Sequence, residues 1–383
     1  MRNGHRSLEV EIEASGNGLE LSPSDTAEAV GLRYVTDAGR GIQRRRIGRG
    51  FVYLRWNGGL IRDEATLNRI RALAIPPAWE NVWICPRPNG HLQATGNDAR
   101  GRKQYLYHTR FRETRDRWKF GRLIAFAASL PAIRSRVEAD LARRGLPREK
   151  VLATVVKLLE TTLIRVGNDE YVERNRSFGL TTMRDQHAKI GTTRIRFEFR
   201  GKGGKEHEIH VVAPRLARIV RQCQELPGQR LFVYFDAESK VRAVTSQDVN
   251  KYLREISGQD FTAKDFRTWA GTALTAWALG RRPPPHSQRA GRRYVNEAVA
   301  EVADQLGNTK TVCRNSYIHP EIIRAYLDRR LHGMLELCFG RARQRRRGLA
   351  REEAAVLYLL EQFSAAPQPH RRRPPLCGTA LRT

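Results

Sequence analysis

Residues 193–212 read TRIRFEFRGKGGKEHEIHVV, two runs of alternating polar and apolar side chains separated by a tip of glycine and lysine. Alternation with a period of two is typical of a strand that buries one face, and a glycine-containing tip between two such runs predicts a β-hairpin. The tip lacks the GxxxxGK[ST] spacing of a phosphate-binding loop, because Glu206 follows its second lysine. We therefore expect a hairpin here and no nucleotide site.

Segments of helical periodicity flank this hairpin. Beyond Trp118 the pattern turns helical, and apolar side chains from Val151 to Leu163 recur on one face before Gly167, which is placed as a C-terminal stop. The central part of the chain is therefore a mainly helical domain interrupted by one hairpin. Three further helices are expected after the hairpin: one from an N-cap at Ser246 to Gly258, one from the capping box of Thr262 and Asp265 to Gly280, and one that stops at Gly307.

The region before Trp118 has a different pattern. Short aromatic or β-branched runs, FVYLRW (51–56), NVWICPRP (81–88) and HLQATG (91–96), are separated by Gly, Pro and Asn, which predicts a small β-rich domain. The expected fold class is α+β. The expected regions are a flexible tail at 1–32, the β-rich domain at 33–117, the larger helical domain at 118–340 and a basic extension at 341–383.

The charge balance limits the class of molecule that the protein can be expected to bind. The 383 residues include 69 Lys and Arg against 40 Asp and Glu, a formal net charge of +29. Nucleic acid is the favoured polyanion, because binding by spread-out cations releases counterions from phosphates. A membrane surface fits less well, since no apolar run of about 18 residues and no signal-peptide pattern is present. We expect a cytosolic, nucleoid-associated protein that binds double-stranded DNA and no membrane. The arginine runs after residue 341 suit a solubilising tail and direct DNA contact equally.

Metal-binding patterns are weak. The five cysteines are far apart and form no Cys-x-x-Cys pair, so reduced thiols are expected. His207 and His210 in the sequence HEIH could begin a metal site, but no third ligand is evident, and two polar strand residues are the preferred interpretation. We expect no required metal.

Five separated segments resemble, in order and at comparable spacing, the type IB DNA topoisomerases of the poxvirus and bacterial kind, over roughly residues 33–340. The segments are GRKQYLYHTRF (101–111), LIRVGNDEY (163–171), FEFRGKGGKEHEI (197–209), TAKDFRTWAGT (262–272) and LGNTKTVCRNSYIHP (306–320). The resemblance implies a DNA-binding N-terminal domain and a catalytic domain that together form a C-shaped clamp around the duplex. It also implies an enzyme that acts as a monomer.

The resemblance assigns the catalytic roles. Tyr317 becomes the nucleophile, Arg165 and Arg267 the two catalytic arginines, and Lys202 on the hairpin tip the general acid. Lys205 is a close competitor for the acid, and the Gly-Lys dipeptide at 201 and 202 favours Lys202. These residue types supply what cleavage of a phosphodiester without water or a metal requires: an oxygen nucleophile, cations around the non-bridging oxygens and an acid for the leaving oxygen.

This chain departs from the poxvirus-type pattern near the nucleophile. Many such enzymes have a histidine nine residues before the tyrosine, where this chain has Asn308. An amide still donates a hydrogen bond but carries no charge, so we expect Asn308 to keep a weaker form of that role. Asn168 likewise stands where the pattern has a basic residue. His319 follows the tyrosine in a His-Pro pair and is expected at a turn or helix start.

The same resemblance identifies candidate DNA contacts. From the residues alone, GRKQYLY is a basic, aromatic strand edge suited to phosphate contact and to packing on sugars or bases, and core packing of one tyrosine is an equal alternative. The candidates are Arg102, Gln104, Tyr105, Tyr107 and Tyr171.

The implied reaction is relaxation of supercoiled DNA without ATP, through single-strand cleavage, a 3′-phosphotyrosyl intermediate, strand rotation and religation. Two other functions stay open. A tyrosine recombinase or integrase shares the Arg, Lys, Arg, Tyr chemistry, but it usually has His-x-x-Arg where this chain has Lys264-Asp265-Phe266-Arg267. A non-catalytic basic DNA-binding protein would account for the charge but not for five ordered motifs.

Overall fold

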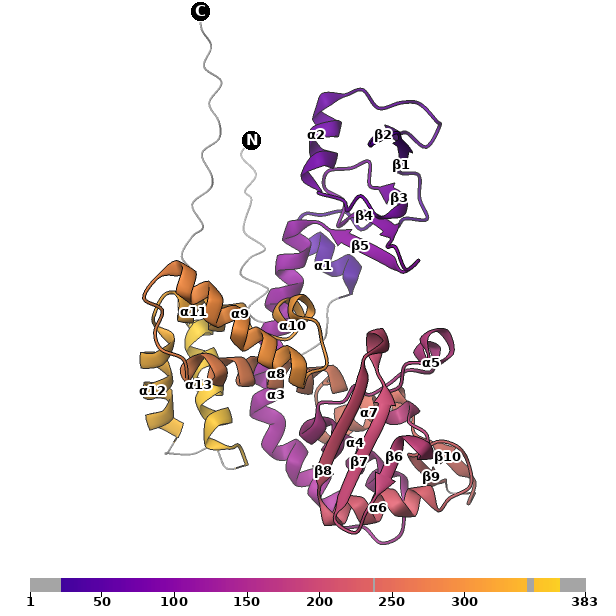
Figure 1. Ribbon diagram of the computed structural model, residues 1–383, viewed down its shortest axis with the longest axis vertical. Coiled ribbons are helices and arrows are strands. Elements are labelled where there is room, and N and C mark those ends of the chain that lie inside the picture. The colour runs from indigo at the N-terminus through magenta and orange to yellow at the C-terminus, as the bar shows by residue number, and fades with distance from the viewer. Residues whose placement is uncertain (1–21, 237, 343–347, 366–383) are drawn as a thin grey trace, which may run out of the picture. The chain divides into compact units, whose positions relative to one another are not determined.

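The computed structural model describes residues 22–236, 238–342 and 348–365 (Figure 1). The chain divides into two compact units, Met1–Arg122 and Leu123–Thr383. The division falls inside helix α3 (Thr109–Leu141), a little beyond the expected domain end at Arg117. As predicted, the fold is mixed α/β, with an N-terminal sheet and a larger helical region. In the described part of the chain, no helix is long and apolar enough to cross a membrane.

The first unit is built on an antiparallel sheet in the order β2-β1-β3-β4-β5, so β5 is an edge strand as predicted. The inner face of the sheet and helix α2 bury a small aliphatic core that includes Ile42, Ile70 and Ile84. The elements are α1 (Pro23–Ala29), β1 (Ile42–Ile47), β2 (Gly50–Leu54), α2 (Glu64–Ala72), β3 (Glu80–Ile84), β4 (Leu92–Asn97) and β5 (Lys103–Tyr107).

Strand β1 was not expected from the sequence, because the run IQRRRI contains three adjacent arginines. Arg44 is tolerated on the half-buried face because its guanidinium donates to the main-chain oxygens of Ile75, Pro76 and Trp79, at 2.7–3.2 Å. A buried cation whose donors are satisfied costs far less than an unpaired one. Hydrophobic alternation alone therefore could not reveal this strand.

The expectation of a tail at 1–32 is wrong for its last third, while residues 1–21 lie outside the described part. Pro23–Ala29 form helix α1, with Pro23 in the first turn and the Ser22 hydroxyl accepting from the Asp25 N–H at 3.2 Å. Ala27 packs with Leu32 and Phe111. A helix of seven residues with so few apolar positions has no periodicity to detect.

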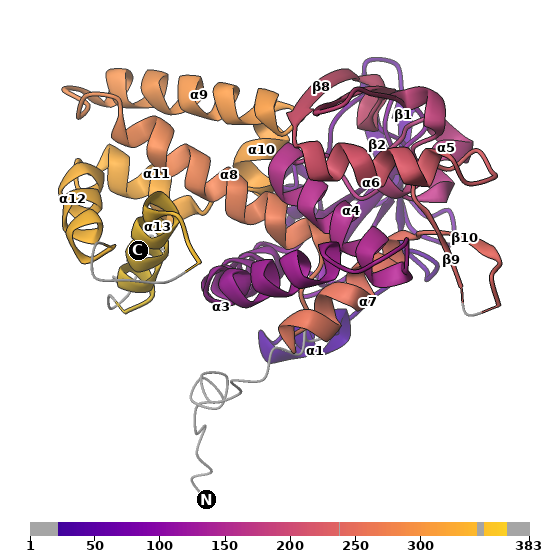
Figure 2. The ribbon, with the colours of Figure 1, turned by 90° about the horizontal axis from the view of Figure 1, so that it is seen from below.

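The second unit centres on helix α8, which contacts α4, α7, α9, α11, α12 and α13. Figures 1 and 2 show α9 and α11 running alongside it. Its helices after α3 are α4 (Arg148–Thr162), α5 (Asp169–Asn175), α6 (Pro214–Gln224), α7 (Ser246–Ser257), α8 (Ala263–Gly280), α9 (Gln288–Gln305), α10 (Lys310–Ser316), α11 (Pro320–Leu327), α12 (Leu331–Ala342) and α13 (Arg351–Ala365). Its strands are β6 (Ala188–Ile190), β7 (Arg194–Arg200), β8 (Glu206–Val212), β9 (Val233–Phe235) and β10 (Val241–Ala243).

The predicted hairpin is confirmed as β7 and β8, which pair antiparallel from Arg194 opposite Val212 to Arg200 opposite Glu206. Strand β6 extends it to a three-stranded sheet that rests on α6. The tip, Lys202–Gly204, forms a short 3₁₀ turn, and Gly203 has a φ of +81° that favours glycine.

Two predicted helix ends are corrected. Helix α4 stops at Leu163, whose φ of +57° places it in the left-handed region, and not at Gly167. The Leu163 carbonyl accepts a hydrogen bond from Arg267, a tertiary contact that the local sequence pattern cannot contain. Helix α7 is capped one residue earlier than expected, by Thr245 in a reciprocal pair with Asp248. The other expected ends, including the Asp265 capping box of α8 and the stop at Gly307, are confirmed.

The expected basic extension contains a helix that packs into the second unit. Helix α13 buries Leu357, Leu359 and Leu360, and it contacts α8 and α12. Its Glu353 binds Arg134 of α3 at 2.7 Å and accepts from the Trp269 indole of α8 at 3.3 Å. The arginine runs that suited a tail fall largely at 343–347 and 371–373, outside the described residues.

Candidate active site

The main chain at Tyr317 is packed tightly onto helix α8. Tyr317 is the C-cap of α10, and its carbonyl accepts from the Thr272 hydroxyl at 3.2 Å. A Cβ at Gly271 would lie 2.6 Å from that carbonyl oxygen and 2.9 Å from the Cβ of Tyr317. Glycine at 271 therefore allows α8 and the tyrosine to approach this closely.

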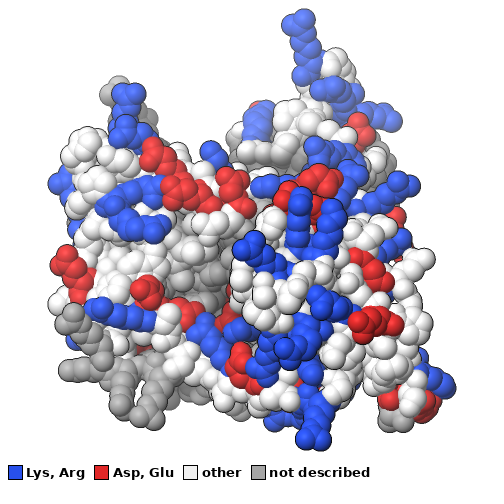
Figure 3. All heavy atoms as spheres, turned by 60° about the horizontal axis from the view of Figure 1, so that its bottom comes forward, with Lys and Arg blue, Asp and Glu red and all other residues white. Residues whose placement is uncertain are grey.

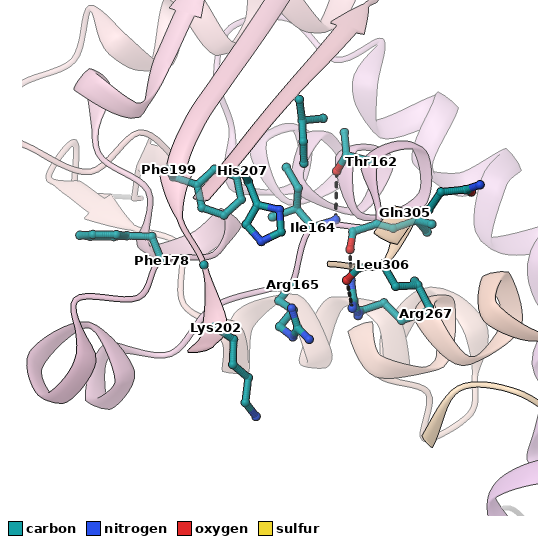
Figure 4. Close-up of a pocket in the computed structure, with 13 residues that line it drawn as sticks. Thr162, Ile164, Arg165, Phe178, Phe199, Lys202, His207, Arg267, Gln305 and Leu306 are labelled. Carbon is teal, nitrogen blue, oxygen red and sulfur yellow. Dashed lines mark hydrogen bonds between the residues drawn. The ribbon is translucent and has the colours of Figure 1, made fainter. Parts of the chain in front are cut away.

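Arg267 lies one helical turn before Gly271 on α8 and is 4% exposed. Its Nη1 donates to the Leu163 carbonyl at the end of α4, and its Nη2 donates to the Leu306 carbonyl at the end of α9, at 2.6 Å. The two helix ends thus hold the guanidinium in one orientation (Figure 4). Its buried Nε has no hydrogen-bond partner among the described residues.

Arg165 and Asn308 meet at the same place. Arg165 follows the end of α4, and its Nη2 donates to the Asn308 Oδ1. This contact uses the amide oxygen of Asn308. The amide nitrogen, Nδ2, is buried and has no hydrogen-bond partner in the described part of the chain. A buried unpaired donor costs free energy unless a ligand completes it. Asn308 therefore presents a hydrogen-bond donor beside Arg165.

The two arginines act on the ionisation of Tyr317. The Arg267 guanidinium carbon lies 5.1 Å from the centre of the tyrosine ring. Burial raises the pKa of Tyr317, but the charges of Arg267 and Arg165 outweigh it and hold the pKa below its ordinary value of 10.0. Burial and the neighbouring Arg165 lower the pKa of Arg267 to about 10, so the guanidinium is still charged at neutral pH.

Lys202 reaches the site from the hairpin tip. It lines one pocket with Arg165 and Arg267, and Figure 4 shows the three side chains in a row. Its Nζ lies 5.3 Å from the ring centre of Tyr171, an exposed residue of α5. Lys205 differs, because its Nζ forms an ion pair with Asp304 at 3.5 Å. Of the two candidate acids, Lys202 lines this pocket and Lys205 is engaged elsewhere.

His207 is the pocket residue that sequence reasoning missed. The HEIH histidines were interpreted as ordinary strand residues, which holds for His210, exposed and paired with Glu208 at 2.9 Å. His207 instead lines the pocket with Arg165, Arg267 and Lys202. Within residues 22–236, 238–342 and 348–365, no group of three or more His, Cys, Asp or Glu side chains could hold a metal ion. The alternation of β8 signals a strand but not which face meets a pocket.

The remaining residues near the site have structural contacts. The Asn168 side chain caps α5 by accepting from the Glu170 N–H at 2.9 Å. His319 caps α11 and accepts from the Glu321 N–H at 3.2 Å, which confirms the expected helix start.

The four candidate DNA contacts at 102–107 lie in the first unit. The Tyr105 and Tyr107 rings are both exposed on β5 and stack with centroids 6.2 Å apart. Arg102 and Gln104 converge on the Asp98 carboxylate, at 2.7 and 3.0 Å, and this contact with Arg102 lowers the pKa of Asp98 to about 2. The segment is thus an edge strand with an aromatic face and polar side chains held in place.

Positive charge is spread widely over the protein. Many Lys and Arg side chains are exposed on the face seen in Figure 3, with Asp, Glu and uncharged residues among them. Such a distribution suits contact with many phosphates more than one deep anion site.

Comparison with known proteins identifies the family. Residues 108–332 match the family model described as eukaryotic DNA topoisomerase I, catalytic core, and residues 50–98 match the bacterial DNA topoisomerase IB N-terminal domain. The DNA topoisomerase 1B of Acanthamoeba polyphaga mimivirus is 30% identical over 293 residues, which cover 75% of this chain and 87% of the viral one. That of vaccinia virus strain Copenhagen is 21% identical over 243 residues, covering 61% of this chain and 72% of its own. With a catalytic-core match over more than half of its length and a relative 30% identical over most of both chains, the chain belongs to the type IB DNA topoisomerases.

Proposed function

We propose that this topoisomerase relaxes supercoiled duplex DNA by transient cleavage of one strand, with Tyr317 as the nucleophile. The observation that carries the proposal is a tyrosine whose pKa is lowered by Arg267 and Arg165, with the unpaired Asn308 amide bonded to Arg165. Two guanidinium groups acting on one phenol, with an amide donor beside one of them, suit an anionic, five-coordinate phosphate better than a neutral substrate.

These positions support the following chemical step. Water takes the proton of the Tyr317 phenol, the phenolate attacks phosphorus so that a new bond forms between its oxygen and phosphorus, and the bond from phosphorus to the 5′ oxygen breaks. Arg165, Arg267 and the Asn308 amide stabilise the non-bridging oxygens, and Lys202 transfers its proton to the departing 5′ oxygen. The enzyme is left on the 3′ phosphate. Religation is the same step in reverse.

The reaction exchanges one phosphodiester for another, so it is close to neutral in energy and needs neither ATP nor a required metal ion. Torsion in the DNA drives strand rotation between cleavage and religation. We further propose that the protein acts as a monomer and binds double-stranded DNA as a C-shaped clamp. It would be cytosolic and associated with the nucleoid. Tyr105 and Tyr107 on one unit, and Tyr171 on the other, are the proposed DNA contacts, together with Arg102 and Gln104.

The test is relaxation of a supercoiled plasmid with EDTA present and ATP absent. Wild type is expected to relax it, and Tyr317→Phe is expected to bind DNA but to form no covalent adduct. Tyr294→Phe, which alters a tyrosine of α9, is the matched control. Full relaxation by Tyr317→Phe would refute the assignment. Joining of two specific sites with no relaxation of other plasmids would instead identify a recombinase.

A further inference from the structure

His207 occupies an unusual place on the hairpin. Its ring stacks on Phe199 of the paired strand, with centroids 5.0 Å apart and planes 15° from parallel. Figure 4 shows the ring beside Phe199 and Ile164, on the side of the pocket where Arg165 lies. His210, three residues further along the same strand, is exposed. Only one of the two histidines therefore faces the proposed chemistry.

The His207 ring touches two glycines from distant parts of the chain. A Cβ at Gly201 would lie 2.6 Å from the ring Cδ2 and Nε2, and a Cβ at Gly307 would lie closer still to Cε1. Gly201 has a φ of −93°, which any residue adopts, so contact with the ring is the constraint there. The ring fills the space between these two main-chain segments.

Each of these glycines directly precedes a proposed site residue: Lys202 follows Gly201, and Asn308 follows Gly307. The tip carries the proposed acid, and the loop after α9 carries the amide beside Arg165. A flat ring held on one side by Phe199 has little freedom to adjust. The ring therefore limits how closely the two segments approach each other.

We propose that His207 is a positioning residue, a spacer that fixes the hairpin tip carrying Lys202 against the loop carrying Asn308. The inference rests on the proposed function, since it concerns where the acid and the amide stand in that reaction. His207 acts by shape. Burial, followed by the charges of Lys205, Arg165 and Arg267, lowers its pKa, so the ring adds no charge to the site at neutral pH.

The proposal predicts a loss confined to the step that needs a correctly placed acid. Replacement of the bridging 5′ oxygen by sulfur gives a leaving thiolate; thiols are far more acidic than alcohols, with a pKa of about 8.5 for cysteine, so the thiolate needs no proton to depart. A misplaced Lys202 should therefore slow cleavage of the oxygen substrate and spare the sulfur substrate. General damage to the fold should slow both alike.

The experiment measures single-turnover cleavage of a duplex containing a cleavage site mapped with the wild-type enzyme, in oxygen and sulfur forms. His207→Ala is expected to lose on the order of 10- to 100-fold with oxygen and far less with sulfur. His207→Phe, which keeps a flat ring, should recover most of the rate. His210→Ala is the matched control and should behave as wild type. Thermal unfolding of each variant reports its stability.

Gly201→Ala gives a second test that keeps the histidine. The added methyl should displace the ring and produce the same selective loss, and Gly201→Ala with His207→Ala should relieve the collision and recover part of the rate. Equal losses with both substrates in His207→Ala and Gly201→Ala, or wild-type rates in both, would overturn the proposal. A wild-type protein that forms no adduct with either substrate would instead overturn the proposed function.

Discussion

The two sides of the candidate site hold their cations in different ways. On the helical side, Arg267 is buried on α8, and carbonyls from the ends of α4 and α9 fix its guanidinium. On the hairpin side, Lys202 is exposed on a glycine-containing tip, with its Nζ 5.3 Å from the ring centre of Tyr171. Charge stabilisation benefits from donors fixed before the substrate arrives, whereas a proton donor must reach one leaving atom. The difference therefore matches the two chemical tasks proposed for these side chains.

The largest effect on the rate of DNA cleavage is expected on the hairpin side. Lys202→Ala should slow cleavage on the order of 10²- to 10⁴-fold, the usual contribution of a general acid, while leaving thermal stability unchanged because the side chain is exposed. Lys205→Ala, which breaks only the ion pair with Asp304, is the matched control. Single-turnover cleavage with ordinary DNA provides the measurement. A larger loss in Lys205→Ala would reverse the assignment of the acid.

On the helical side, loss of one preorganised donor should cost less in rate but also affect the fold. Arg267→Gln should slow cleavage on the order of 10²- to 10³-fold. It should also lower stability by about 1–3 kcal/mol, since the Leu163 and Leu306 carbonyls lose their donors. Cleavage rates and urea unfolding measure the two effects separately. A rate loss without a stability loss would show that the carbonyl contacts do not support the fold.

A smaller effect is expected for the amide beside Arg165. Asn308→Ala should slow cleavage about tenfold, because it removes one neutral hydrogen bond worth about 1.4 kcal/mol at the transition state. Asn308→His restores a donor and should recover more of the rate than Asn308→Leu. Rates of adduct formation with saturating enzyme would measure this. If all three variants formed the adduct at the wild-type rate, Asn308 would have no part in the mechanism.

The smallest expected effect is a shift in the ionisation of Tyr317. In the free protein its phenolate should form at a lower pH than that of an ordinary tyrosine, and Arg267→Gln should move the transition to higher pH by removing a positive charge. Ultraviolet difference absorption between wild type and Tyr317→Phe isolates this group. Tyr252 and Tyr326, whose pKa values are raised by burial, would ionise later. A transition unchanged by Arg267→Gln would contradict the electrostatic coupling.

The parts of this protein that sequence predicted are those encoded locally. The hairpin, the capping box at Asp265 and the glycine stop at Gly307 depend on neighbouring residues, and the structure has each of them. Strand β1 and the end of α4 depend on distant contacts, made by Arg44 and by Arg267, and the sequence pattern missed both.

In the candidate site, too, some features could be predicted from local sequence and others depend on distant contacts. A family resemblance could name Tyr317, Arg165, Lys202 and Arg267 one motif at a time. It could not show that the Asn308 amide has a buried free donor, or that His207 lies against two glycines. The contact of Arg165 with Asn308 and that of His207 with Gly307 join segments far apart in the sequence, which no local pattern records.

The close packing of Tyr317 on α8 has a mechanical consequence. In the proposed covalent state, the covalent link between the cut strand and the protein is the phenolic oxygen of this side chain. Torque and tension from the rotating duplex would therefore reach the main chain at Tyr317. There the Thr272 hydroxyl and the contact with Gly271 pass the load to a helix packed against six others. The same helix carries Arg267, so a pull on the DNA end would move nucleophile and arginine together and keep them in register for resealing.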